Sequence, residues 1–568
     1  MNLISSLAFF IFVQVTLLVP GYALAGGIKS LKARPGIKLS LAYLISLSLI
    51  ALLSTAAYAL RLPLGLTRTI TWLVIIAGVF LFIKQRLWRE LAASRLPLIC
   101  LVLMSLFSLA FIGLTFNQKY SFIPDPEFNA SRNYQVLHVK VLNVAQTNAN
   151  DNYIPYRQAQ FFLNRSDPAK DSFIGEWGVG FFQRTPLMGA VTAGYLNLFG
   201  EKPPVDYTWS KGAADKRHTY LQFQIIAQIL NALFIVPAFF TLRKLFNKKV
   251  AALTCLFLVI SPFFLYNAIF SWPKSFVAFF VLTAWLLLFE NKRSFTYLAG
   301  VAGGLAYLTH DLAVLYIGAT LILLLYNRRP RDSLIFVITS FLFAIPWLAT
   351  SALIYHSPSS FIYYPFSTAG IPQETGRAVL RQFLHTPPSK IIGIRLDSLY
   401  YLLSPYQLIY SEGGQEIGAR LWALSLFSIP GAVGFGLIIP ALLGVFKKLA
   451  KLGFWILVLG PVVLCALIIG WPKGLGALHF AEAVVVLLSG LGVAYLTSLK
   501  RAFWFSLAFL AQLAQLVFFI IYSYKNHPDV WFKHGGDILR LFIMAAISAF
   551  VGWSIYQIAT NRRDPVAS

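Results

Sequence analysis

The sequence contains few cysteines, methionines and acidic side chains. Its 568 residues include three cysteines, four methionines and 21 aspartates and glutamates. Each cysteine, at positions Cys100, Cys255 and Cys465, lies in an apolar segment, and the sequence has no CxxC spacing. We therefore expect small buried side chains at these positions. A disulfide framework and a cysteine metal site are excluded.

Charged residues of both signs are also scarce. They make up 12% of the chain, against 58% hydrophobic residues and a mean hydropathy of +0.69, whereas soluble domains carry about 25% charged residues. The sequence holds about fifteen apolar segments that approach the length needed to cross a bilayer. The segment Met1 to Leu24 does not begin with the basic residues typical of a signal peptide, which favours a retained helix over a cleaved signal. The composition predicts an all-α polytopic membrane protein.

Basic residues dominate what charge there is, with a formal net charge of +26. They fall in short clusters in every second connection between apolar segments, which indicates cytoplasmic connections. This pattern favours anionic lipid headgroups over nucleic acid as the counter-charge. It predicts a multi-pass protein of a bacterial inner (plasma) membrane, with the N-terminus outside and the C-terminus in the cytoplasm. The clusters lie at 29–38, 84–89, 243–249, 292–293, 328–331, 447–451, 500–501 and 562–563.

Two of the opposite connections are long, at 117–218 and 356–418, and the first of them is rich in carboxylates. The two long connections divide the chain into four predicted regions. These are N-terminal transmembrane helices (1–95), a transmembrane core that includes the first outer loop (96–355), the second outer loop (356–418) and C-terminal transmembrane helices (419–568). Long loops in compact proteins are usually functional or disordered. The first loop is rich in aromatic residues, which disfavours disorder.

Short helices are expected within both outer loops. The segment Pro186–Phe199 is too short to span the membrane but apolar enough to lie at its boundary or dip into it. In the second loop, Glu374–His385 and Ser389–Leu403 have the pattern of amphipathic helices that lie on a membrane.

Several short motifs occur in order along the chain. Asp151-Asn-Tyr153-Ile-Pro-Tyr156-Arg is followed by Gly175-Glu176-Trp177-Gly178 and by Arg184-Thr-Pro-Leu187. Trp272-Pro-Lys274 then opens an apolar segment, and Gly300-Val-Ala-Gly-Gly-Leu-Ala-Tyr-Leu-Thr-His310-Asp311 ends another.

Over residues 96 to 330 this order resembles the GT-C glycosyltransferases, membrane enzymes that use polyprenyl-phosphate sugars. The family includes protein O-mannosyltransferases and aminoarabinose transferases. The resemblance implies a GT-C-like bundle and transfer of a hexosyl or pentosyl group to a hydroxyl of a glycan, lipid or protein on the extracytoplasmic face. Asp151, Tyr153, Arg184–Leu187 and Phe199-Gly200 match the family's loop motifs.

The chain departs from the family pattern in two places. The family's acid usually follows its first helix closely, often as an Asp-Glu pair, whereas Asp151 comes later and is followed by Asn. Asp125-Pro-Glu127 lies closer to the preceding apolar segment and competes for the role of base. The chain also carries about three additional spans before the resemblance begins.

The chemistry of such a transfer assigns roles to these residues. A hydroxyl needs a carboxylate to take its proton, and a phosphate leaving group needs cations. The resemblance makes no cofactor certain and leaves a divalent ion, Mg or Mn, possible. The candidate base is Asp151, Asp125 or Glu127. Candidates for the donor phosphate are Arg184, His310, Lys274 and His479, and those for acceptor or sugar contact are Tyr153, Tyr156, Glu176, Trp177 and Asp311.

Each of these residues also has an ordinary structural interpretation. Asp151 can cap a helix, Asp125 and Glu127 can be solvated turn residues, and Lys274 can reach to the membrane surface. Two other functions stay open at this point, a polysaccharide polymerase or ligase of the O-antigen kind and a transporter or flippase. The early position of the acidic loop disfavours the first. The absence of a sequence repeat and the location of charges at segment ends disfavour the second.

Overall fold

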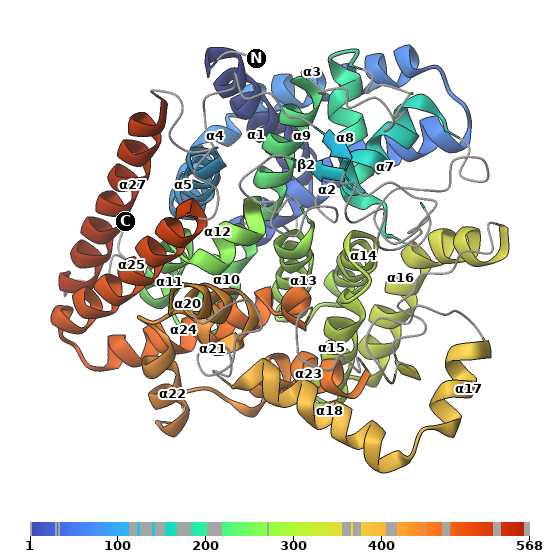
Figure 1. Ribbon diagram of the computed structural model, residues 1–568. Helices are drawn as coiled ribbons and strands as arrows, with labels where there is room; N and C mark the ends of the chain where they lie inside the picture. The colour runs from blue at the N-terminus through green and yellow to red at the C-terminus, as the bar shows by residue number, and fades with distance from the viewer. Residues whose placement is uncertain are drawn as a thin grey trace.

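The computed structural model describes residues 3–28, 31, 34–112, 122–124, 139–141, 154–166, 181, 184–201, 218–269, 272–354, 365–366, 368, 377–404, 417–447, 449–468, 477–525 and 536–561. These residues form a bundle of α-helices (Figure 1). Seven helices are long and apolar enough to cross a membrane, or up to eight when one bent pair counts as a span. The prediction of an all-α polytopic membrane protein is confirmed.

The count of about fifteen spans drawn from the sequence is higher than the number of long helices, because six further apolar helices have only 10–17 residues. At 1.5 Å per residue, a 15-residue helix such as α13 (Lys274–Leu288) is about 22 Å long. That is shorter than the hydrocarbon core of a bilayer, about 30 Å. Apolar windows in the sequence do not distinguish these short buried helices from true spans.

Helix α1 (Leu3–Gly26) packs closely on α2 (Pro35–Ala59) and α3 (Leu64–Lys84). The backbone N–H of Gly21 donates to Ser46 Oγ at 2.9 Å, and a Cβ at this glycine would lie 1.8 Å from the Ala42 carbonyl oxygen. Small residues allow such close helix approach where lipid gives no hydrophobic drive for association. Two helices follow, α4 (Leu87–Leu91) and α5 (Arg95–Ile112).

The first outer loop contributes a small sheet and two buried helices. Strands β1 (Phe122–Pro124) and β2 (Val139–Val141) pair antiparallel, with Phe122 opposite Val141. No pattern in the sequence predicted this pairing. Helices α7 (Ile154–Asn164) and α8 (Leu187–Leu198) pack on each other and on α2. The segment expected at the membrane boundary is therefore a helix buried inside the protein.

Helix α13 lies near the centre of the bundle in Figure 1. Helix α13 contacts α9, α14 and α24. The central helices are α9 (His218–Ala232), α10 (Ile235–Leu245), α11 (Lys248–Val259), α12 (Pro262–Ile269), α13, α14 (Arg293–Thr309), α15 (Ala313–Tyr326) and α16 (Pro330–Ala349).

Two segments that the sequence presents as single spans are broken. The pair α11 and α12 bends by 59° at Ser261-Pro262, because proline has no N–H to continue the helix ladder. The segment 419–446 is corrected from one span to three helices. Ser428 caps the second of these by accepting from the Gly431 N–H at 3.2 Å, and Gly434, with φ +99°, ends it. The three helices are α20 (Ile417–Phe427), α21 (Ile429–Val433) and α22 (Ile438–Phe446).

The second outer loop forms the two helices expected from its amphipathic pattern. These helices, α17 (Arg377–His385) and α18 (Pro388–Leu403), lie at the edge of the view opposite α1 (Figure 1). Arg395 anchors α18 by donating to the Pro365 carbonyl at 2.8 Å. The chain then ends in α23 (Leu452–Ile468), α24 (Glu482–Ser498), α25 (Ala502–Lys525) and α27 (Gly536–Thr560).

Ion pairs join several of the basic connections at one end of the bundle, which we call the basic end. The Glu290 carboxylate lies 2.9 Å from Arg34 and 2.8 Å from Lys244. It thus connects the segment before α2, the end of α10 and the end of α13. Connections that are distant in the sequence meet in space, as the alternating topology requires.

Two further acids pair with basic side chains in the same way. Glu90 contacts the buried ammonium of Lys38, and Asp332 contacts Arg329 at 2.7 Å. Each of these three acids therefore faces a cation. The membrane face toward which the basic end points stays a prediction of the positive-inside rule. The three cysteines are free and buried, as expected.

Candidate active site

The turn before α13 is fixed by a buried amide from α9. Asn231 donates from Nδ2 to the Trp272 carbonyl at 3.1 Å and accepts at Oδ1 from the Phe276 N–H, also at 3.1 Å. Its amide therefore bridges the carbonyl of the turn, which also accepts from the Lys274 N–H at 2.8 Å, and one of the first N–H groups of the helix, which have no partner within the helix. This clamp fixes the start of α13, whose first residue is Lys274. Lys274 is 7% exposed.

Helix α14 ends beside this turn, where His310 contacts Trp272. Its glycines face α16, and a Cβ at Gly304 would lie 2.6 Å from Phe343 Cβ. Ser340 of α16 also donates to the Gly300 carbonyl at 3.1 Å. The glycine-rich motif therefore serves close helix packing. The helix stops because His310 takes an extended backbone, with φ −158° and ψ 131°.

His310 and Asp311 form a buried pair at the end of α14. Nδ1 of His310 lies 3.0 Å from Asp311 Oδ1 and 3.2 Å from the Leu312 backbone nitrogen. These contacts compete, because Nδ1 must carry a proton to bond the carboxylate and must lack it to accept from Leu312. We assign the proton to Nδ1, since a lone pair facing a buried carboxylate oxygen would be repulsive. The ring of Trp272 meets His310 edge-on at 5.8 Å between centroids.

A hydrogen bond from the first outer loop reaches this helix end. Thr185 Oγ1 donates to the Thr309 carbonyl at 2.8 Å, directly beside His310. Gln158 of α7 donates from Nε2 to the Arg184 carbonyl at 3.3 Å. The Arg184-Thr185 turn is thus fixed between α7 and the end of α14.

A buried acid completes the group. Glu482, the first residue of α24, is 1% exposed and interacts electrostatically with Lys274. Its Oε1 has no hydrogen-bond partner among the described residues. Tyr316 of α15 donates its hydroxyl proton to the Phe480 carbonyl, just before Glu482 in the chain. Buried carboxylates are rare unless they are paired. We therefore count Glu482, which lies near Lys274, as part of the site.

The structure therefore brings Lys274, His310 and Asp311 together through Trp272, and the turn of Arg184 adjoins them through Thr185. These residues lie at the opposite ends of α13 and α14 from Glu290 and Arg293, hence at the end of the bundle away from the basic end. We call Arg184, Lys274, His310, Asp311 and Glu482 the charged cluster.

The remaining predicted residues are placed differently. Tyr156 is fully buried, and its hydroxyl lies 2.7 Å from Thr219 Oγ1, so it joins α7 to α9. His479 lies in a 3₁₀ helix (Ala477–Phe480) next to α13, and its side chain is outside the described part. The other six predicted site residues lie outside the described residues. They are the three candidate bases and three candidates for acceptor or sugar contact, namely Asp125, Glu127, Asp151, Tyr153, Glu176 and Trp177.

Four contributors to the site were not among the predicted site residues. Glu482 had a signal, because an acid at the edge of an apolar segment is a functional candidate by default. Asn231, Gln158 and Thr185 had none, because a polar residue in an apolar helix or a turn is ordinary. Their importance depends on carbonyls contributed by distant segments.

The described residues hold no group of three or more His, Cys, Asp or Glu side chains that could bind a metal ion. The two carboxylates of the charged cluster each have a basic neighbour, because Asp311 lies 3.0 Å from His310 and Glu482 interacts electrostatically with Lys274. This arrangement does not fit a divalent ion, which prefers several oxygen ligands. It suits an anion instead.

The fold and the charged cluster together define a polytopic helical membrane protein with basic and acidic side chains gathered at the end of the bundle away from the basic end. Residues 216–354 match the family model described as dolichyl-phosphate-mannose-protein mannosyltransferase. This segment contains Asn231, Lys274 and His310-Asp311. The resemblance noted in the sequence is confirmed there, and the segment is similar to that family. No curated protein matches the chain significantly in sequence.

Three solved structures align with the chain. ArnT from Cupriavidus metallidurans in the apo state aligns with a TM-score of 0.43 and 14% identity, covering 83% of this chain and 76% of that one. The Archaeoglobus fulgidus oligosaccharyltransferase in complex with Zn and sulfate gives 0.42 and 14%, covering 75% and 53%. The A. fulgidus oligosaccharyltransferase AglB with an inhibitory peptide and a dolichol-phosphate gives 0.42 and 15%, covering 82% and 55%. The chain thus spans about half the length of the archaeal enzymes.

Proposed function

We propose that this protein is a membrane glycosyltransferase that moves a sugar from a polyprenyl-phosphate carrier to a hydroxyl acceptor on the extracytoplasmic side. The acceptor is a glycan, a lipid or a protein. The family-model match over residues 216–354 supports the reaction class. The structural observation that carries the proposal is the Thr185–Thr309 hydrogen bond, because it places the Arg184 turn beside His310 and, through Trp272, near Lys274.

The chemistry requires two kinds of group. As the bond between the anomeric carbon and the phosphate oxygen breaks, negative charge stays on the carrier phosphate, and Lys274, His310 and Arg184 stabilise it. A new bond forms from the acceptor oxygen to the anomeric carbon, and the acceptor proton passes to a carboxylate. We assign that carboxylate to the first outer loop, with Asp151 ahead of Asp125 and Glu127.

The charged cluster is suited to binding an anion in a buried place. A charged group out of water is costly unless it is paired, and Asp311 and Glu482 lie beside the basic side chains of His310 and Lys274 before the donor arrives. The phosphate then adds a stronger partner in a setting where charges are poorly screened. The cluster therefore favours a phosphate-bearing donor over a neutral sugar.

The rival functions make different demands. A flippase would move the carrier without breaking its bond to sugar, so it would form no glycosylated product. A polymerase or ligase of the O-antigen kind would require a lipid-linked glycan as a substrate. Product analysis with a purified lipid-linked donor separates all three.

Replacing His310 with alanine is expected to raise the KM for the lipid donor by about 10- to 100-fold, because a charge-assisted hydrogen bond contributes about 1.5–3 kcal/mol. The measurement is initial rate against donor concentration at fixed acceptor in detergent or proteoliposomes. His385→Ala is the matched control, since His385 is exposed on α17 and contacts only its own helix, at the Arg381 carbonyl. Equal donor KM values for His310→Ala and the unmodified protein would contradict the assignment.

Asn231 is a positioning residue, and Asn231→Leu should lower kcat and the thermal midpoint together. The substitution leaves the Phe276 N–H buried without a partner, at about 1–3 kcal/mol. It also removes one of the two donors to the Trp272 carbonyl, which keeps the Lys274 N–H at 2.8 Å. Asn267→Leu is the control, because Asn267 is equally buried but donates only within its own helix, to the Phe263 carbonyl at 2.9 Å. If Asn231→Leu loses stability but keeps kcat, the clamp does not position the site.

A further inference from the structure

A cavity of about 540 Å³ opens at the basic end, the far end of the bundle from the charged cluster. It lies between the ends of α10, α13 and α15. Its polar lining comes from Lys244, Asn291, Asn327 and Arg329, and its other walls are leucine and phenylalanine side chains. The volume is within the range of ligand pockets, about 300–1,000 Å³, and larger than a bare phosphate requires.

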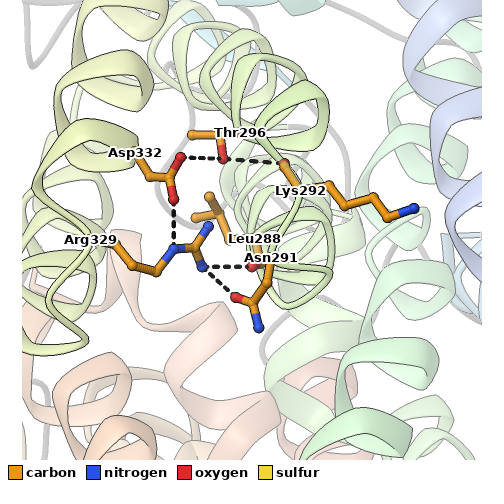
Figure 2. A network of polar contacts seen from close by, with 6 residues as sticks. All are labelled: Leu288, Asn291, Lys292, Thr296, Arg329 and Asp332. Carbon is orange, nitrogen blue, oxygen red and sulfur yellow. Dashed lines mark hydrogen bonds and ion pairs between the residues drawn. The ribbon is translucent and has the colours of Figure 1, made fainter.

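The Arg329 guanidinium is fixed by Asp332 of α16, by the last residue of α13 and by Asn291 just after that helix (Figure 2). It donates from Nε to Asp332 at 2.7 Å and from Nη1 to the Leu288 carbonyl at 3.1 Å and Asn291 Oδ1 at 2.6 Å. Its Nη2 is buried and has no partner among the described residues. The side chain is therefore preorganised, with one donor group unused.

Two side-chain amides add donors. Since Oδ1 of Asn291 accepts from Arg329, the group that Asn291 has left is its Nδ2, which can only donate. Asn327 lines the cavity, and its amide makes no hydrogen bond to a described residue. Lys244 contributes an ammonium that is half exposed although it contacts Glu290. The cavity thus offers several donors.

The acids around the cavity are already occupied. Glu290 is shared by Lys244 and Arg34, and Asp332 is held by Arg329. Two cations therefore share Glu290, which leaves the local charge positive. A site with unused donors and a positive local charge selects an anion.

The surroundings identify the source of that anion as a lipid. Leu325 and Tyr326, at the end of α15 beside the cavity, are half exposed on a helix of an otherwise apolar protein. Basic pockets between membrane helices on the cytoplasmic side recognise anionic headgroups. A free phosphate would leave the leucine and phenylalanine walls without a partner, whereas acyl chains would cover them.

We infer that this cavity binds the phosphate headgroup of an anionic phospholipid. Arg329 Nη2 and the Asn291 and Asn327 amides donate to the phosphate oxygens, and the acyl chains run along the apolar end of α15. The site is separate from the proposed transfer reaction. It gives the basic end a specific lipid contact beyond the general attraction of its positive charge.

The test is native mass spectrometry of the purified full chain with added dioleoyl-phosphatidylglycerol, and with dioleoyl-phosphatidylcholine in parallel. We expect one phosphatidylglycerol to be retained at higher collision energy than any phosphatidylcholine. Asn327→Asp places a carboxylate in the cavity without touching the Arg329 network, and Lys244→Gln removes a cation while Glu290 keeps Arg34. Each should weaken retention about tenfold.

Lys292→Gln is the matched control, because Lys292 is exposed on the same segment and Figure 2 shows its ammonium directed away from Arg329. It should retain phosphatidylglycerol as the unmodified protein does. Thermal unfolding of each variant establishes that it is folded. Equal retention of both lipids, unchanged retention in a folded Asn327→Asp, or displacement of the lipid by inorganic phosphate would overturn the inference.

Discussion

Lys274→Met is expected to lower kcat/KM for the lipid donor by about 100- to 1,000-fold, the usual effect of removing one preorganised group that stabilises charge in a transition state. Lys274 begins α13 inside the charged cluster and is almost fully buried. In such a place an ammonium acts on a leaving phosphate with little screening by water. No other lysine in the described ranges lies near both Trp272 and Glu482.

The same substitution should destabilise the fold. It leaves Glu482 buried without its neighbouring cation, and an uncompensated buried charge costs about 3–5 kcal/mol. The double variant Lys274→Met, Glu482→Gln removes both charges and should recover most of that stability. Activity should stay low in the double variant, because the phosphate still lacks its cation.

Thermal unfolding in detergent and steady-state transfer, measured on the same preparations, separate the two effects. Lys390→Met is the control, since Lys390 is an exposed lysine on α18. If the double variant recovered full transfer together with stability, Lys274 would serve only to neutralise Glu482. The assignment to the phosphate would then be wrong.

The sequence predicted the arrangement of helices where the pattern is local. Amphipathic spacing gave α17 and α18 nearly to the residue. The alternation of basic clusters grouped connections that the ion pairs of Glu290 and Glu90 join in the structure. It failed at 419–446, because Ser428 and Gly434 act through a cap and a positive φ that an average over apolar residues does not register.

The candidate site was predictable in its residue types but not in its contacts. Lys274, His310 and Arg184 were identified because charges at the ends of apolar segments are expensive and therefore informative. That Glu482 lies near Lys274, or that Thr185 bonds the Thr309 carbonyl, depends on how separate helices pack. Tyr156 shows the same dependence, because the contact of its hydroxyl with Thr219 joins two helices, while its assignment to acceptor or sugar contact stays a prediction.

Asp151→Asn should reduce transfer by about 100- to 10,000-fold, the contribution of a positioned general base, while protein yield and donor KM stay unchanged. Asp151 lies outside the described residues, but it precedes α7 by three positions, and α7 is tied to the Arg184 turn through Gln158. Rates are compared with those of Asp125→Asn, Glu127→Gln and the control Asp206→Asn, an acid of the same loop. A normal rate in Asp151→Asn with loss in Asp125→Asn or Glu127→Gln would move the base to the Asp125-Pro-Glu127 segment. Normal rates in all three would rule out Asp151, Asp125 and Glu127 as the base.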